Sequence, residues 1–132
     1  MSILFVCIYN ACRSQIAEAI CRKLAPNSWL IASVGSNPSD RVDMKAVNIL
    51  KKHQLAMESI KPKSFSSLPA IPWDYVVSMD RRSKCVSMPT AKFIEWDVPD
   101  PEDGPMRLYE SLFDDLMNRV RKLIREVEGS PL

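Results

Sequence analysis

The chain has 132 residues, 46% of them hydrophobic and 26% charged, which fits one globular domain, residues 1–132, that buries a core without disulfides. Its 18 basic and 16 acidic residues leave a formal net charge of +2, a surplus too small to indicate nucleic-acid binding. Only three glycines are present, so a glycine-rich nucleotide loop is excluded and any anion-binding loop must be built without glycine.

The chain opens on an apolar run rather than on a targeting signal. No positively charged residue precedes this run of about seven residues, and polar residues end it before any cleavage site. No later stretch approaches the ~18 apolar residues of a membrane span. We therefore expect a cytoplasmic protein that does not bind membranes, in which the four cysteines are thiols.

Four apolar runs rich in β-branched residues predict strands. Helical periodicity separates them: a four-residue repeat of apolar residues follows the first run and is stopped by Pro26, and a second helix is expected from Asp43 to about His53. Residues 60–72 are expected to hold a short helix or turn. The last helix carries an apolar stripe from Leu108 to Val127 and ends at Gly129. The predicted strands are Ile3–Ile8, Trp29–Ser33, Tyr75–Met79 and Phe93–Trp96.

This alternation of strands and helices predicts an α/β fold. We expect a central four-stranded parallel sheet with helices on both faces, and a phosphate-binding loop between strand 1 and helix 1. In such sheets the active crevice lies at the carboxyl ends of the strands.

The junction between the first strand and first helix reads Cys7-x5-Arg13-Ser14. A short loop over a helix N-terminus points several backbone N–H groups at one spot, and an arginine adds a fork that matches a tetrahedral oxyanion. Such surroundings favour a thiolate, so Cys7 is expected to be a nucleophile at neutral pH. Ser14 is expected either to cap the helix or to hydrogen-bond the thiolate, and Asn10 to adopt a positive φ. The expected anion-binding residues are Ile8, Tyr9, Asn10, Ala11, Cys12, Arg13 and Ser14.

A thiolate that attacks phosphorus needs an acid for the leaving group. His53 is the only histidine and belongs to the second predicted helix, so the acid is expected to be a carboxylate. Asp100 is the best candidate because prolines on both sides stiffen a loop that leaves the same sheet edge as Cys7. The rival acids are Asp97, Glu102 and Asp103.

These segments resemble the low-molecular-weight protein tyrosine phosphatase superfamily, which includes thioredoxin-linked arsenate reductases. The resemblance implies that Cys7 attacks the phosphoryl group and that Arg13 binds its oxygens. It implies that Asp100 protonates the leaving oxygen and then activates the hydrolytic water, with no metal or organic cofactor. Asn10 and Ser14 would hold the loop and the thiolate. The matching segments are residues 6–19, 32–35, 74–80 and 98–101.

The two branches of the superfamily are both represented in the sequence. Asp80 and the Val-Pro-Asp-Pro sequence around Asp100 are similar to the phosphatases, whereas the short chain and Trp96 are similar to the reductases. The paired tyrosines that usually follow Asp-Pro in phosphotyrosine phosphatases are replaced by Glu102 and Asp103, and Tyr9 stands where many relatives carry glycine.

The resemblance also implies redox roles for two cysteines. Cys12 can form a reversible disulfide that protects Cys7, the alternative being a buried loop thiol. Cys85 stands at the position of the last cysteine of the reductase relay and is either the resolving thiol or inert, while Asp80 occupies the middle position. Cys21 is expected in the core. The cysteine spacing and the single histidine argue against a metal site.

Three functions follow as hypotheses. The first is a phosphatase that acts through a cysteinyl phosphate on a phosphorylated protein or a small phosphomonoester. The second is an arsenate reductase that uses Cys7, with Cys85 or an external thiol as the resolving group and thioredoxin, glutaredoxin or a small thiol as the reductant. The third is an oxyanion-binding protein without turnover.

Overall fold

The computed structural model describes residues 1–57, 61–80 and 90–129. Its sheet has four parallel strands in the order β2-β1-β3-β4. All six residues of the central strand β1 are buried, as expected for a parallel strand covered on both faces. The predicted α/β class and four-stranded parallel sheet are confirmed. The strands are β1 (Ser2–Cys7), β2 (Leu30–Gly35), β3 (Trp73–Ser78) and β4 (Thr90–Glu95).

The strands differ from their predicted bounds by one to three residues. β3 and β4 start earlier than predicted because they pair with each other from Trp73 and Thr90 onward, before the apolar runs begin. β1 includes Ser2, whose backbone N–H donates to the Asp74 carboxylate at 2.8 Å. Backbone pairing extends a strand beyond its apolar segment, which a hydrophobic pattern does not record.

The helices are α1 (Arg13–Leu24), α2 (Met44–Lys52), α3 (Met106–Glu128) and the short 3₁₀ helix η1 (Phe65–Ser67). Asp43 caps α2 by accepting a hydrogen bond from Lys45 N at 2.9 Å. Gly129 ends α3 in the left-handed conformation at φ 64°. These boundaries agree with the predicted start near Asp43, the predicted stop at Gly129 and the predicted short helix or turn in residues 60–72.

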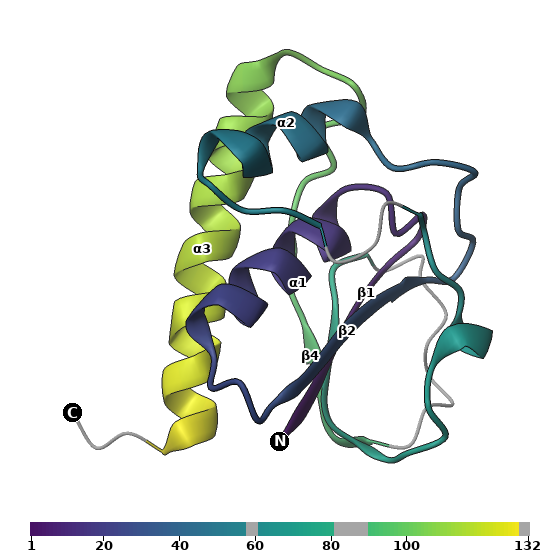
Figure 1. The fold of residues 1–132 in the computed structure, drawn as a ribbon, viewed down its shortest axis with the longest axis vertical. Coiled ribbons are helices and arrows are strands. Elements are labelled where there is room, and N and C mark those ends of the chain that lie inside the picture. Colours follow the sequence, from purple (N-terminus) through teal and green to yellow (C-terminus); the bar gives the residue numbers. More distant parts are fainter. Residues whose placement is uncertain (58–60, 81–89, 130–132) are drawn as a thin grey trace.

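The helical cover of the two sheet faces is unequal. On one face α1 and α3 pack side by side and α2 contacts both, enclosing the larger core, which includes Phe5, Ile16 and Leu116 (Figure 1). The other face buries Leu4, Val6 and Trp73 under the segment that contains η1. Prolines at 62, 69 and 72 explain why this segment forms only one 3₁₀ turn. Among the described helices, none is both long and apolar enough to span a membrane.

Because all four strands are parallel, their carboxyl ends share one edge. The β1–α1 loop (residues 8–12), residues 79 and 80 after β3, and the β4–α3 loop (residues 96–105) all leave this edge. The sequence candidates from distant parts of the chain therefore meet here.

Candidate active site

The β1–α1 loop turns sharply without containing a glycine. Asn10 takes the left-handed conformation at φ 51°, as predicted. Space for the loop comes from Gly35 at the end of the neighbouring strand, where an added Cβ would lie 2.6 Å from Ile8 O and 2.9 Å from Asn10 N. Gly35 thus makes room for the loop although it lies on another strand, because any larger residue at position 35 would collide with the loop backbone.

Cys7 is buried at the end of β1, and its Sγ lies 2.9 Å from Ser14 Oγ. The expectation that Ser14 caps α1 is wrong: Cys12 is the N-cap residue, without a side-chain cap bond, and Ser14 lies in the first turn. α1 starts early because Ile16 N already donates to Cys12 O at 2.9 Å. The Ser14 hydroxyl is therefore available to hydrogen-bond Cys7, which was the alternative role predicted for it.

Asn10 is the hub of a buried hydrogen-bond network beneath Cys7. Its Nδ2 donates to Ser14 Oγ at 2.7 Å and to Ser33 Oγ at 2.9 Å. Its Oδ1 accepts from Gln15 Nε2 at 3.1 Å and from Lys63 N at 2.8 Å. Since Ser14 Oγ accepts from Asn10, its own proton is free to donate to a Cys7 thiolate.

The same network ends at a buried carboxylate. Ser33 Oγ donates to Glu18 Oε1, which fixes the direction of the Ser33 proton and leaves its lone pairs for Asn10. Glu18 is 1% exposed and is compensated by Arg22 Nε at 2.8 Å and Lys63 Nζ at 3.5 Å. The countercharges of Arg22 and Lys63 therefore maintain the donor pattern that points toward Cys7.

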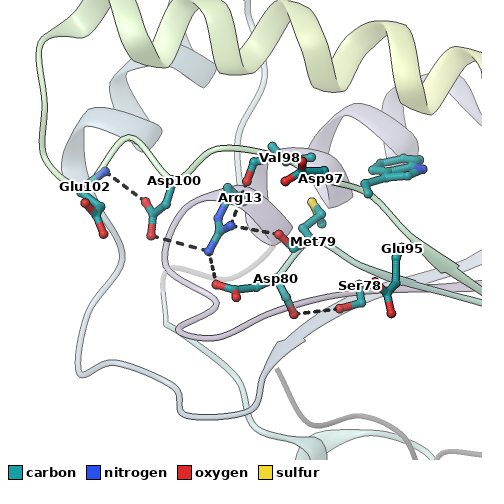
Figure 2. Close-up of a pocket in the computed structure, with 10 residues that line it drawn as sticks. Arg13, Ser78, Met79, Asp80, Glu95, Asp97, Val98, Asp100 and Glu102 are labelled. Atoms are coloured by element: carbon teal, nitrogen blue, oxygen red, sulfur yellow. Dashed lines mark hydrogen bonds and ion pairs between the residues drawn. The ribbon is translucent and has the colours of Figure 1, made fainter. Parts of the chain in front are cut away.

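Arg13 is 5% exposed and joins three segments at the carboxyl edge (Figure 2). Its Nη1 donates to Met79 O at 2.9 Å and to Val98 O at 3.0 Å. Its Nη2 donates to Asp80 Oδ2 at 2.8 Å and lies 3.5 Å from Asp100 Oδ2. The guanidinium is thus held by two carbonyls and the Asp80 carboxylate, and the Asp100 carboxylate forms an ion pair with it.

Asp100 lies in the β4–α3 loop with its side chain 22% exposed. Its Oδ1 accepts from Glu102 N at 3.0 Å, and its Oδ2 faces Arg13 (Figure 2). This local turn orients the carboxyl group, which a proton donor requires.

Two cavities lie on either side of Arg13. The smaller, of about 220 Å³, brings together the sequence candidates Cys7, Tyr9, Ala11, Cys12, Arg13 and Asp100. The larger, of about 450 Å³, is lined by the end of β3 and by the β4–α3 loop (Figure 2). Arg13, Asp100 and Glu102 line both. A thiol, a guanidinium and a carboxyl group therefore face one small space, the set of groups that thiol-based phosphoryl transfer needs.

The family model described as "Low molecular weight phosphotyrosine protein phosphatase" matches residues 2–130. The chain belongs to this family.

Relatives within the family carry two kinds of name. The chain is 34% identical over 87 residues to the low molecular weight phosphotyrosine protein phosphatase of Rattus norvegicus; the match covers 60% of this chain and 54% of the rat protein, about half its length. It is 24% identical over 131 residues to the glutaredoxin arsenate reductase of Synechocystis sp., covering 95% of this chain and 97% of that one. A solved arsenate reductase from Archaeoglobus fulgidus has a TM-score of 0.80 and 31% identity, and covers 92% of this chain and 98% of its own.

Burial raises the pKa values of two further described cysteines, Cys12 and Cys21. Burial raises the pKa of the Cys12 thiol well above its ordinary value, and the Asp43 carboxylate adds to the rise. Burial within the core raises the pKa of Cys21 to about 12. Cys85, the expected resolving thiol, lies outside the described residues. In the ranges that the structure describes, no three metal-ligating side chains are grouped to hold an ion.

The sequence interpretation predicted the supporting roles of Asn10 and Ser14 but not the contacts of Ser33 and Asp80. Ser33 was matched only within the segment 32–35. Asp80 was matched to the phosphatases and to the middle position of the cysteine relay, without a predicted contact to Arg13. The signal that could have found Asp80 is its place immediately after β3, at the same edge as Cys7. Of the rival acids, Glu102 lines both cavities, Asp97 lines only the larger, and Asp103 points to Lys45 instead.

Proposed function

We propose that this chain is a thiol-dependent phosphomonoester hydrolase that acts through a cysteinyl-phosphate intermediate. The observation that carries the proposal is the shared 220 Å³ cavity, in which Cys7, Arg13 and Asp100 face one another. Its substrate would be a phosphorylated protein or a small phosphomonoester in the cytoplasm.

In the first step Cys7 Sγ attacks phosphorus. An S–P bond forms, the bond from phosphorus to the ester oxygen breaks, and Asp100 gives its proton to that leaving oxygen. Arg13 and the N-terminal N–H groups of α1 stabilise the charge on the transferring oxygens, and Ser14 stabilises the thiolate before attack. The step uses no metal.

In the second step water attacks the cysteinyl phosphate. Asp100, now a carboxylate, takes a proton from the water as its oxygen bonds to phosphorus, and the S–P bond breaks. Inorganic phosphate leaves, and the Cys7 thiolate and the Asp100 carboxyl group are restored.

A second function, arsenate reduction, is favoured by the full-length match to the Synechocystis arsenate reductase and by the presence of Cys12 in the same cavity as Cys7. Cys7 would displace water from arsenate to form an S–As(V) adduct. A second thiol would then attack Cys7 Sγ, so that two thiols are oxidised to a disulfide and arsenic leaves as arsenite. Thioredoxin, glutaredoxin or a small thiol would reduce that disulfide.

One parallel assay of the reduced protein tests both functions. Hydrolysis of p-nitrophenyl phosphate that is lost in Cys7→Ser supports the phosphatase. Arsenate-dependent oxidation of thioredoxin or glutaredoxin that is lost in Cys7→Ser and Cys85→Ser supports the reductase with Cys85 as the resolving thiol. Persistence of reduction in Cys85→Ser assigns the resolving step to Cys12 or to an external thiol. Tight phosphate binding with neither activity would overturn both.

A further inference from the structure

The β4–α3 loop holds a backbone conformation that its own residues disfavour. Glu102 and Asp103 are consecutive, are not glycines, and take φ values of 47° and 60°. Left-handed backbone is costly for such residues and persists only where surrounding contacts enforce it. Since Asp100 lies only two residues before Glu102, whatever holds this turn also sets the position of Asp100.

Two elements from outside the loop hold the turn at Asp103. Lys45 of α2 donates from Nζ to Asp103 O at 3.0 Å and to Gly104 O at 2.8 Å. From α3, the hydroxyl of Tyr109 accepts from Asp103 N at 3.1 Å. Tyr109 is fully buried, so it is the more rigid of the two anchors.

The Tyr109 hydroxyl also reaches toward the β1–α1 loop. It donates to Asp43 Oδ2, and Asp43 N in turn donates to Ala11 O at 2.9 Å. Asp43 therefore contacts the nucleophile-bearing loop through its backbone and Tyr109 through its side chain. Burial and the hydrogen bond to Asp43 raise the pKa of Tyr109 well above its ordinary value, so the hydroxyl remains a donor across the neutral range.

We propose that the Asp43–Tyr109 hydrogen bond is a strut that fixes the β4–α3 loop against the β1–α1 loop, so that Tyr109 is a positioning residue for the proton donor Asp100. The chain of contacts runs from Ala11 through Asp43 and Tyr109 to Asp103, three residues beyond Asp100. Neither Asp43 nor Tyr109 hydrogen-bonds Asp100, so the effect passes through the backbone of the turn. The inference rests on the proposed hydrolase function.

The test is Tyr109→Phe, which keeps the buried ring and removes only the hydroxyl. Tyr75→Phe, on β3, is the matched control. The discriminating measurement is kcat/KM for phenyl phosphate, whose leaving oxygen needs a proton, against p-nitrophenyl phosphate, whose leaving oxygen needs it less. In Tyr109→Phe we expect a loss of about tenfold for phenyl phosphate and less than about threefold for p-nitrophenyl phosphate. Tyr75→Phe should change neither.

An equal loss on both substrates would mean that Tyr109 only stabilises the fold, and no loss would mean that the strut is irrelevant; either result overturns the proposal. If Tyr109→Phe does not fold, Asp43→Ser takes its place, because serine can still cap α2 but is too short to bond Tyr109. The same selective loss is then expected.

Amide hydrogen exchange at Asp103 separates this proposal from the proposed function. Exchange should accelerate in Tyr109→Phe and not in Tyr75→Phe, whether or not the protein turns over a phosphomonoester. Unchanged exchange would overturn the strut. If exchange accelerates in Tyr109→Phe but the wild-type protein hydrolyses no phosphomonoester, the hydrolase function is overturned instead. The role of Asp100 as proton donor then falls with it.

Discussion

The two loops that carry the candidate catalytic residues are held in different ways. The β1–α1 loop is fixed from below by short side chains, since Asn10, Ser14 and Ser33 form a fully buried hydrogen-bond network. The β4–α3 loop is partly exposed and is held by long side chains, Lys45 and Tyr109, that reach it from other elements. Cys7, the proposed nucleophile, is therefore part of the core, whereas Asp100, the proposed proton donor, lies in a loop that is attached to the core from outside.

This difference predicts how substitutions in each loop affect stability and activity. When one member of a buried network is removed, several hydrogen bonds are lost at once. The remaining groups cannot bond water instead, because they are buried. A loop held by separate anchors loses one contact at a time. Substitutions in the first loop should therefore disturb stability and activity together, and those in the second should disturb activity with small changes in stability.

Arg13→Lys should have the largest effect because Arg13 directly follows the β1–α1 loop and its side chain contacts the β4–α3 loop. A lysine ammonium cannot replace the guanidinium fork that donates to Met79 O, Val98 O and Asp80 at the same time. It also cannot bind two phosphoryl oxygens in the bidentate way of an arginine. We expect kcat/KM for p-nitrophenyl phosphate to fall by about 10³-fold. Arg125→Lys, an exposed change on α3, is the control. A loss below tenfold would show that the guanidinium is not needed for the reaction.

Asn10→Gly tests the buried network alone, because glycine accepts φ 51° without strain. It removes the Asn10 side chain that bonds Ser14 Oγ, Ser33 Oγ, Gln15 Nε2 and the Lys63 N–H. We expect the free energy of unfolding in urea to fall by about 2 to 4 kcal/mol and kcat/KM to fall by about 10- to 100-fold. Wild-type stability in this variant would contradict the view that the hub supports the nucleophile.

Glu102→Gly is the matched change in the other loop. It relieves a left-handed backbone and keeps the N–H that donates to Asp100. Removing this backbone strain should slightly outweigh the extra entropy that glycine gives the unfolded chain. We therefore expect the free energy of unfolding to rise by about 0.5 kcal/mol. Urea denaturation beside Asn10→Gly makes the comparison direct. A fall of more than about 1 kcal/mol would show that this loop is as tightly packed as the first.

Alkaline pH should slightly lower the free energy of unfolding through the Cys12 thiol of the β1–α1 loop. The pKa of Cys12 is raised in the folded protein, so the unfolded chain releases this proton first as the pH rises. The stabilisation is complete below the unfolded thiol value of about 8.5 and is lost progressively above it. Between pH 8.5 and 10 we expect the free energy of unfolding to decline by about 1 kcal/mol more in wild type than in Cys12→Ser. Parallel pH curves would contradict this.

The sequence indicated the loop that carries Cys7 because every element of that signal is local. The strand, the Cys-x5-Arg-Ser spacing and the periodic helix lie within about twenty residues, and Asn10 was chosen for its tolerance of positive φ. The pairing of Arg13 with Asp80, the space left by Gly35 and the link from Asp43 to Tyr109 could not be predicted in this way. Each joins residues from different elements, and which side chains meet depends on how those elements pack.

By itself, then, the sequence determined an α/β chain with a thiol, an arginine and a carboxylic acid at one edge of a parallel sheet. Periodicity and motif spacing are properties of neighbouring residues, and parallel strands bring their carboxyl ends together whatever the loops contain. The tertiary structure alone decided that Ser14 faces Cys7 rather than capping α1, and that glycine from the next strand makes a glycine-free loop possible. The physical reason is that hydrogen-bond partners and close approaches are fixed by packing across the chain.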